Sequence, residues 1–189
     1  MLELESRIFE ATGLAMVSKE TDEADDNMST NPEDEKKEQI QIAWKKPIQG
    51  KGHSSPIVWG DRVFVTTSLT DQNERRLLCL DRLTGKILWN NLVVKSLPES
   101  IHRLNSRASG TPATDGRQIY VTFMRAEGKK VIAPNVGSDR MITPGKIIVA
   151  AYNFNGKLKW KSNVGDFVSA HGFNSCPLLF EDLVIINGD

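Results

Sequence analysis

Residues 55–65 read SPIVWGDRVFV, and this stretch recurs as TPATDGRQIYV at 111–121 and as CPLLFEDLVII at 176–186. Each copy has a proline, a short run, a turn marked by glycine or acidic residues, and a second run rich in β-branched, aromatic and other apolar residues. Two strand-forming runs around a tight turn predict a β-hairpin. The chain therefore repeats one predicted hairpin three times.

A second hairpin is predicted after each of the first two copies. Residues 81–89 read DRLTGKILW, and residues 153–160 read NFNGKLKW, which is one residue shorter. Each has a glycine turn between two strand-forming runs and ends in tryptophan. Two hairpins per repeat make a four-stranded antiparallel unit. Units that recur at this spacing predict an all-β fold, a β-propeller built from four-stranded blades.

The repeats divide the chain into predicted blades. Trp44 matches the tryptophan that ends the second hairpin, so residues 40–46 are predicted to form the outer strand of a blade. The other predicted units are a blade at 53–90, a blade at 108–162 and a half blade at 173–189. Two insertions, 91–109 between the blades and 125–145 within the second blade, are expected to form loops on the propeller faces.

This number of blades does not close a ring, because propellers have about four to eight blades. We expect the remaining blades to come from a longer chain, and the alternative is assembly with other chains. Without either, the exposed edge strands would favour aggregation.

The 189 residues carry 24 basic and 24 acidic side chains, which are unevenly distributed. Residues 1–39 hold 12 acidic and 4 basic side chains, whereas residues 40–189 hold 12 and 20. The stretch 19–38 has no aromatic or β-branched apolar residue, so residues 1–39 are predicted to be an acidic, disordered segment. Apolar residues between 2 and 17 suit a short amphipathic helix, which Gly13 interrupts.

The sequence shows no targeting signal. A secretory signal needs a basic start and an uninterrupted apolar core, and a membrane-spanning helix needs roughly 18 apolar residues in a row. Neither pattern is present, so we predict no membrane span. The only cysteines, Cys79 and Cys176, fall on predicted strands of different units. Both are predicted to be small buried hydrophobic side chains, and no disulfide framework or zinc site is expected.

Residues 79–89, CLDRLTGKILW, resemble the tryptophan-docking repeat of the pyrroloquinoline-quinone (PQQ) family of propellers. The second copy keeps the alanine of this repeat at Ala151 and has Asn153 in place of the aspartate. The segments at 52–64, 105–116 and 171–175 also resemble PQQ-binding-like repeat proteins. The resemblance covers about residues 40–189 and implies a propeller. It also implies an exported or periplasmic protein, although the sequence carries no signal peptide.

The turns and tryptophans of the second hairpins are predicted to be structural. Gly85 and Gly156 permit the positive φ of a tight turn. Each tryptophan is expected to spread its apolar face over the neighbouring blade. These predicted docking residues are Trp44, Trp89 and Trp160.

Small and polar residues precede each proline, on segments predicted to line the central channel. Three positions before the prolines stand His53, Ser109 and Asn174, and two positions before stand Ser54, Gly110 and Ser175. One interpretation is a polar ring that holds an ion or a small ligand. The other is that narrow strands near the axis admit only small residues.

Four further polar residues lie in the predicted connections between blades and can converge on one face. They are His102, Asn105, Arg107 and His171. Together with His53 and Asn174 they form the candidate set of ligand-binding residues. The alternative role is hydrogen bonding to the loop backbone.

The sequence contains no Gly-x-Ser-x-Gly elbow, no His-Glu-x-x-His motif and no phosphate-binding loop. We therefore predict no catalytic residue and no metal site. The favoured interpretation is a non-catalytic scaffold, similar to assembly members of the PQQ family, which binds a protein or a small ligand on a propeller face. No cofactor and no nucleic acid are expected. The alternative implied by the resemblance is part of a dehydrogenase that uses PQQ with calcium.

Overall fold

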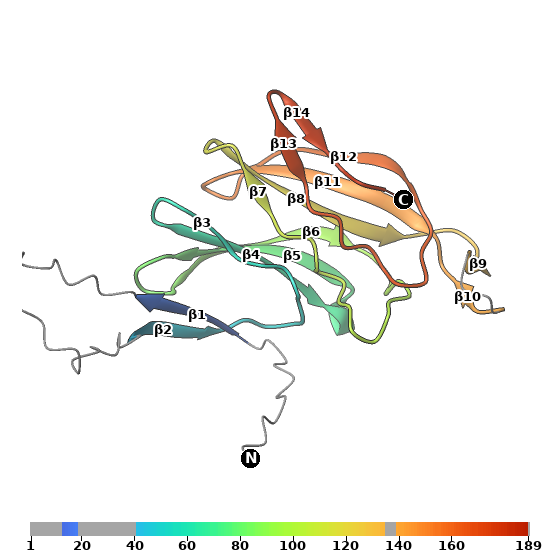
Figure 1. Cartoon of the computed structure of the whole chain (residues 1–189), viewed down its shortest axis with the longest axis horizontal. Helices are drawn as coiled ribbons and strands as arrows, with labels where there is room; N and C mark the ends of the chain where they lie inside the picture. Colours follow the sequence, from blue (N-terminus) through green and yellow to red (C-terminus); the bar gives the residue numbers. More distant parts are fainter. Residues whose placement is uncertain (1–12, 19–40, 135–138, 189) are drawn as a thin grey trace, which may run out of the picture.

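The computed structural model describes residues 13–18, 41–134 and 139–188. Apart from the short 3-10 helix η1 (Thr70–Gln72), the regular elements of these residues are β-strands, and the sheets stand side by side (Figure 1). The predicted all-β fold with four-stranded antiparallel blades is confirmed. The predicted disorder of the acidic stretch at 19–38 lies outside the described residues. Nowhere in the described part of the chain is a helix long and apolar enough to cross a membrane.

The first blade is an antiparallel sheet in the order β3-β4-β5-β6. Its strands are β3 (Ile57–Trp59), β4 (Arg62–Leu69), β5 (Glu74–Asp81) and β6 (Ile87–Lys95). Strands β4 and β5 are buried on both faces, because further sheets cover each side of the blade. This double burial explains why their sequences are almost continuously apolar rather than alternating.

The second blade has the order β12-β11-β8-β7. Its strands are β7 (Ala113–Thr114), β8 (Gln118–Ala126), β11 (Gly145–Asn153) and β12 (Leu158–Phe167). Between β8 and β11, the short strands β9 (Val131–Ile132) and β10 (Met141–Ile142) pair with each other away from the blade (Figure 1).

Two further sheets have only two strands each. The third hairpin consists of β13 (Leu178–Phe180) and β14 (Leu183–Ile185), and the other sheet pairs β1 (Gly13–Ser18) with β2 (Gln41–Pro47). The helix expected between residues 2 and 17 is wrong for residues 13–18, because they form β1. Their backbone groups pair with the edge of β2, which local sequence patterns do not reveal.

The hydrophobic core lies between neighbouring sheets. Phe64, Leu77 and Cys79 of the first blade pack against apolar residues of the second blade. The opposite face of the first blade meets Trp44 and Ile48. The second blade packs against the third hairpin through a cluster of apolar side chains: Met124, Ile147, Val149, Phe167, Phe173, Val184 and Ile186. Each interface therefore joins one sheet to the next along the chain.

Trp44 and Trp89 each contact the glycine turn of the following sheet. Trp44 Nε1 donates to Arg82 O at 2.8 Å, and a Cβ on Gly85 would lie 2.5 Å from the indole. Trp89 Nε1 donates to Phe154 O at 2.9 Å, and a Cβ on Gly156 would lie 2.9 Å from this ring. Both glycines have positive φ, +67° and +79°.

Trp160 is placed differently from the other two tryptophans. It is 39% exposed, and its ring lies 6.1 Å from that of Tyr120 in its own blade. The cysteines also differ from each other. Cys79 is buried, and desolvation raises the pKa of its thiol to about 11. The prediction that Cys176 is buried is wrong: it is exposed, because it precedes the third hairpin, where its Sγ accepts a hydrogen bond from Thr111 N at 3.2 Å.

Candidate functional site

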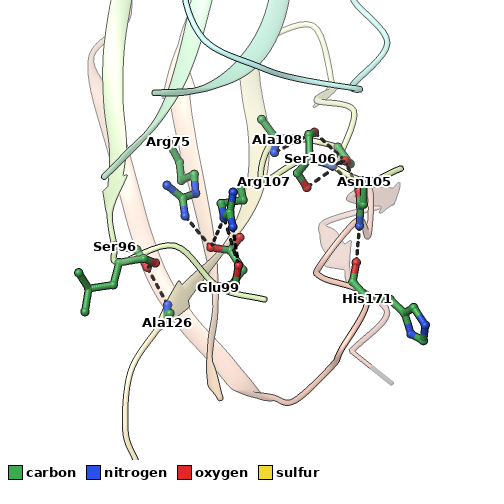
Figure 2. A network of polar contacts seen from close by, with 11 residues as sticks. Arg75, Ser96, Glu99, Asn105, Ser106, Arg107, Ala108, Ala126 and His171 are labelled. Atoms are coloured by element: carbon green, nitrogen blue, oxygen red, sulfur yellow. Dashed lines mark hydrogen bonds and ion pairs between the residues drawn. The ribbon is translucent and has the colours of Figure 1, made fainter. Parts of the chain in front are cut away.

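The connection from the first to the second blade contains the loop at 96–109, here called the interblade loop. This loop is anchored at its start, because Ser96 N donates to Asn73 O at 2.8 Å and Ser96 Oγ accepts from Ala126 N at 2.8 Å. Figure 2 shows how the loop then carries charged and polar side chains to both neighbouring blades. It is thus fixed to the blades rather than projecting freely.

A buried ionic cluster holds the middle of this loop. Arg75 Nη2 donates to Glu99 Oε2 at 2.5 Å, and both side chains are almost fully buried, with 0% and 2% exposure. Arg107 Nε lies 3.6 Å from the same oxygen, and Arg107 also donates to the backbone oxygen of Glu99. Burial, opposed by Glu99 and reinforced by Arg75, lowers the pKa of the Arg107 guanidinium. The cluster therefore has one negative and two positive charges, and losing the carboxylate would leave buried positive charge uncompensated.

Asn105 links three parts of the molecule. Its Oδ1 accepts from Ser106 N at 2.8 Å and from Ser109 Oγ at 2.5 Å. Its Nδ2 donates to His171 O at 2.7 Å, in the segment before the third hairpin. Ser106 Oγ in turn accepts from His53 N at 3.1 Å. This amide side chain therefore connects the first blade, the second blade and the third hairpin (Figure 2).

The two loop histidines lie beside each other on the surface. Their ring centroids are 6.0 Å apart, and His102 N donates to His171 O at 3.1 Å. His102 Nδ1 accepts from Leu104 N at 3.2 Å, which fixes the orientation of this ring. Among the described residues, no group of three or more histidine, cysteine, aspartate or glutamate side chains could hold a metal ion.

A pocket of about 260 Å³ opens beside these residues. Its polar walls include Asn105, His171 and Asn174. Phe167 and Phe173 add an aromatic wall, with their rings edge to face and 5.2 Å apart. A larger depression of about 340 Å³ lies elsewhere, between β12 and the third hairpin, and it contains none of the candidate residues. The polar pocket is therefore the place where the candidate set comes together.

The structure brings some of the candidate residues together and separates others. Asn105, His171 and Asn174 share the pocket, and His102 lies next to His171. Arg107 faces the buried cluster instead. The exposed His53 is connected only through its backbone NH, in the hydrogen bonds described above.

The small residues before the prolines hold the inner segments of neighbouring sheets together. Ser54 Oγ accepts from Thr66 N at 3.3 Å, and Ser175 Oγ accepts from Asn187 N at 3.1 Å. A Cβ on Gly110 would lie 2.8 Å from Ser175 O. These hydroxyls and this close approach give the segments a role in joining blades.

Sequence reasoning missed Arg75 and Glu99, and it also missed Thr66 and Thr122. Thr122 Oγ1 donates to Ser175 O at 2.6 Å, as Thr66 Oγ1 donates to Gly110 O at 3.3 Å. Both threonines stand ten positions after the prolines of their repeats, a coincidence that could have identified them. Glu99 offered no such signal, because the interblade loop has no counterpart in another repeat.

Repeated four-stranded sheets, packed face to face and joined by tryptophan contacts, define a propeller repeat protein. A family model described as outer membrane protein assembly factor BamB matches residues 36–166. The chain belongs to this family of PQQ repeat proteins.

Two solved structures are similar to the chain. BamB from Moraxella catarrhalis is 16% identical with a TM-score of 0.46, and the match covers 77% of this chain and 33% of that one. A europium-containing methanol dehydrogenase is 18% identical with a TM-score of 0.44, with coverages of 67% and 20%. The chain therefore spans about a third of the former and a fifth of the latter. A search of curated proteins found no match.

Proposed function

We propose that this chain is a non-catalytic binding scaffold, and that the pocket between the interblade loop and the third hairpin receives a segment of a partner protein. The observation that supports this proposal most strongly is the bracing of the pocket walls. Asn105 binds His171 O, and the buried cluster around Glu99 holds the same loop from below. A rim fixed in this way loses little conformational entropy when a partner binds.

The chemistry of the pocket suits a peptide. Asn174 and His171 are exposed at its edge and can exchange hydrogen bonds with peptide groups, while Phe167 and Phe173 offer an apolar wall for one side chain. Pockets for drug-sized ligands usually measure about 300–1,000 Å³. A volume of about 260 Å³ therefore favours a short side-chain anchor over a large flat cofactor. The name of the matching family refers to protein assembly, which agrees with a protein partner.

The test uses displayed random peptides selected on the full chain. Binding of the selected peptides is then measured on Asn174→Arg, which places a long charged side chain at the pocket, and on Asp71→Arg, a matched change at another exposed position. We expect Asn174→Arg to weaken binding about tenfold or more and Asp71→Arg to leave it unchanged. Equal binding to both variants, or failure to select any peptide, would contradict the proposal.

A further inference from the structure

Two sheets of this molecule resemble complementary halves of one blade. Strand β2 holds the position of an outermost strand, because Trp44 contacts the Gly85 turn as Trp89 of β6 contacts the Gly156 turn. Strand β1 pairs antiparallel with β2, as β5 pairs with β6. The β1–β2 sheet therefore corresponds to the two outer strands of a blade.

The third hairpin corresponds to the two inner strands. Leu178 pairs with Ile185 in β13 and β14, as Ile57 pairs with Phe64 in β3 and β4. The hydrogen bond from Asn187 N to Ser175 Oγ matches the one from Thr66 N to Ser54 Oγ, as noted above. Within the described residues, β14 pairs only with β13 and β1 only with β2, so each sheet has an edge without a partner strand.

We propose that two copies of the 189-residue chain associate through composite blades, in which β14 of one copy pairs with β1 of the other. The third hairpin of one copy and the β1–β2 sheet of the other then form a four-stranded sheet like those of the complete blades. With its six residues, β1 is long enough to pair along residues 183–188. Pairing also covers both open edges, which native proteins avoid leaving exposed.

The number of blades selects a dimer. Each copy contributes two complete blades and two halves, which amounts to three blades. Two copies give six blades, within the range of about four to eight seen in closed propellers, whereas one copy gives too few and three copies give too many. A ring of two copies has two-fold symmetry, the commonest closed arrangement of identical chains.

A contact between aromatic side chain and turn supports this arrangement independently. Trp59 packs on the turn of the second blade, where a Cβ on Gly116 would lie 2.6 Å from the indole. Phe180 holds the repeat position of Trp59, and Gly60 holds that of Gly116. Phe180 is 58% exposed, and a Cβ on Gly60 would meet no described atom within 4 Å. In the dimer, Phe180 of one copy packs on the Gly60 turn of the other.

The residues before the prolines form a second series. Ser55 N donates to Thr111 Oγ1 at 3.0 Å, and Thr111 N donates to Cys176 Sγ at 3.2 Å. The next bond of the series runs from Cys176 N to Ser55 Oγ of the second copy. One rotation from blade to blade thus accounts for the observed bonds and for the one that closes the ring.

Apolar side chains are available for this interface. Leu178, Leu183 and Ile185 are 62%, 54% and 45% exposed on the third hairpin. Their counterparts Ile57 and Phe64 of the first blade lie in the core beside the second blade. A second copy would cover the third hairpin in the same manner and remove this apolar surface from water.

The mass of the full chain in solution tests the proposal. Light scattering after size exclusion should give twice 21.1 kDa. Phe180→Asp should raise the dissociation constant of the dimer by about tenfold or more, because it places a charge at the centre of the contact. The control is Leu97→Asp, an equally exposed leucine in the interblade loop, which should remain dimeric. Far-UV circular dichroism verifies that both variants fold.

A cross-link tests the geometry. Asp61 and Glu181 adjoin Gly60 and Phe180, so the double variant Asp61→Cys/Glu181→Cys, in a Cys176→Ser background, should form covalent dimers with a short bismaleimide. Neither single variant should do so, and the buried Cys79 should not react. A monomer at all concentrations, open-ended larger oligomers, a dimer unaffected by Phe180→Asp, or a dimer without this cross-link would each overturn the proposal.

Discussion

Replacing Trp89 with alanine should destabilise the protein far more than the same change at Trp160. Trp89 packs in the core between the blades, with its ring 5.9 Å from that of Phe64, and its Nε1 donates to Phe154 O. Truncating a buried aromatic side chain to alanine usually costs about 3 to 5 kcal/mol. The lost hydrogen bond accounts for about 1 kcal/mol of this cost.

Trp160 provides the matched comparison. It ends the equivalent strand of the second blade, but it is 39% exposed and packs against Tyr120 of its own blade. We expect Trp160→Ala to cost about 1 to 2 kcal/mol, since less apolar surface leaves water there. Trp89→Phe keeps an aromatic ring and removes the indole NH, so it should fall between the wild type and Trp89→Ala.

Urea unfolding of the full chain, followed by far-UV circular dichroism at one protein concentration, measures these differences. The slopes must be similar for the free energies of unfolding to be compared, and the fixed concentration removes any effect of self-association. A loss below about 1 kcal/mol for Trp89→Ala, or equal losses for both tryptophans, would refute the reasoning about docking.

Three further predictions follow from the buried groups and from the proposed function. Glu99→Gln should lower the free energy of unfolding by about 3 to 5 kcal/mol, because Arg75 and Arg107 would lose their shared carboxylate; an unchanged urea midpoint would contradict this. Native protein at pH 8 should react with a thiol reagent through Cys176 alone, since Cys79 is buried and its raised pKa keeps the thiol protonated; two fast-reacting thiols would show that Cys79 is accessible. PQQ with calcium should neither raise the melting temperature nor support alcohol-dependent dye reduction, whereas binding at about a hundred times the dissociation constant would add about 2.7 kcal/mol; a raised melting temperature with turnover would favour the dehydrogenase alternative.

The sequence allowed the blades to be predicted because their information is local and repeated. Each proline hairpin and each glycine turn contains its own strand and turn signals within a dozen residues, and the copies reinforce one another. Strand β1 could not be predicted in this way. Its pairing with β2 joins Gly13 to Pro47 and Ser18 to Gln41, and the partners are too distant in sequence for periodicity to connect them. Cys176 was misjudged for a related reason, since its strand-like sequence does not say which side of the third hairpin is covered.

The candidate site was only partly predictable, and the division has a physical cause. Contacts between blades recur from repeat to repeat, as with Thr66 and Thr122, so they follow from the period. Asn105 and Glu99 belong to the interblade loop, which has no second copy against which it can be aligned. These two residues position the pocket and the buried cluster. Loops on a rigid repeat scaffold are the usual place for function. The non-repeating loop is therefore where changes should alter binding while leaving the blades intact, with Glu99 as the exception because its carboxylate also stabilises the interface between them.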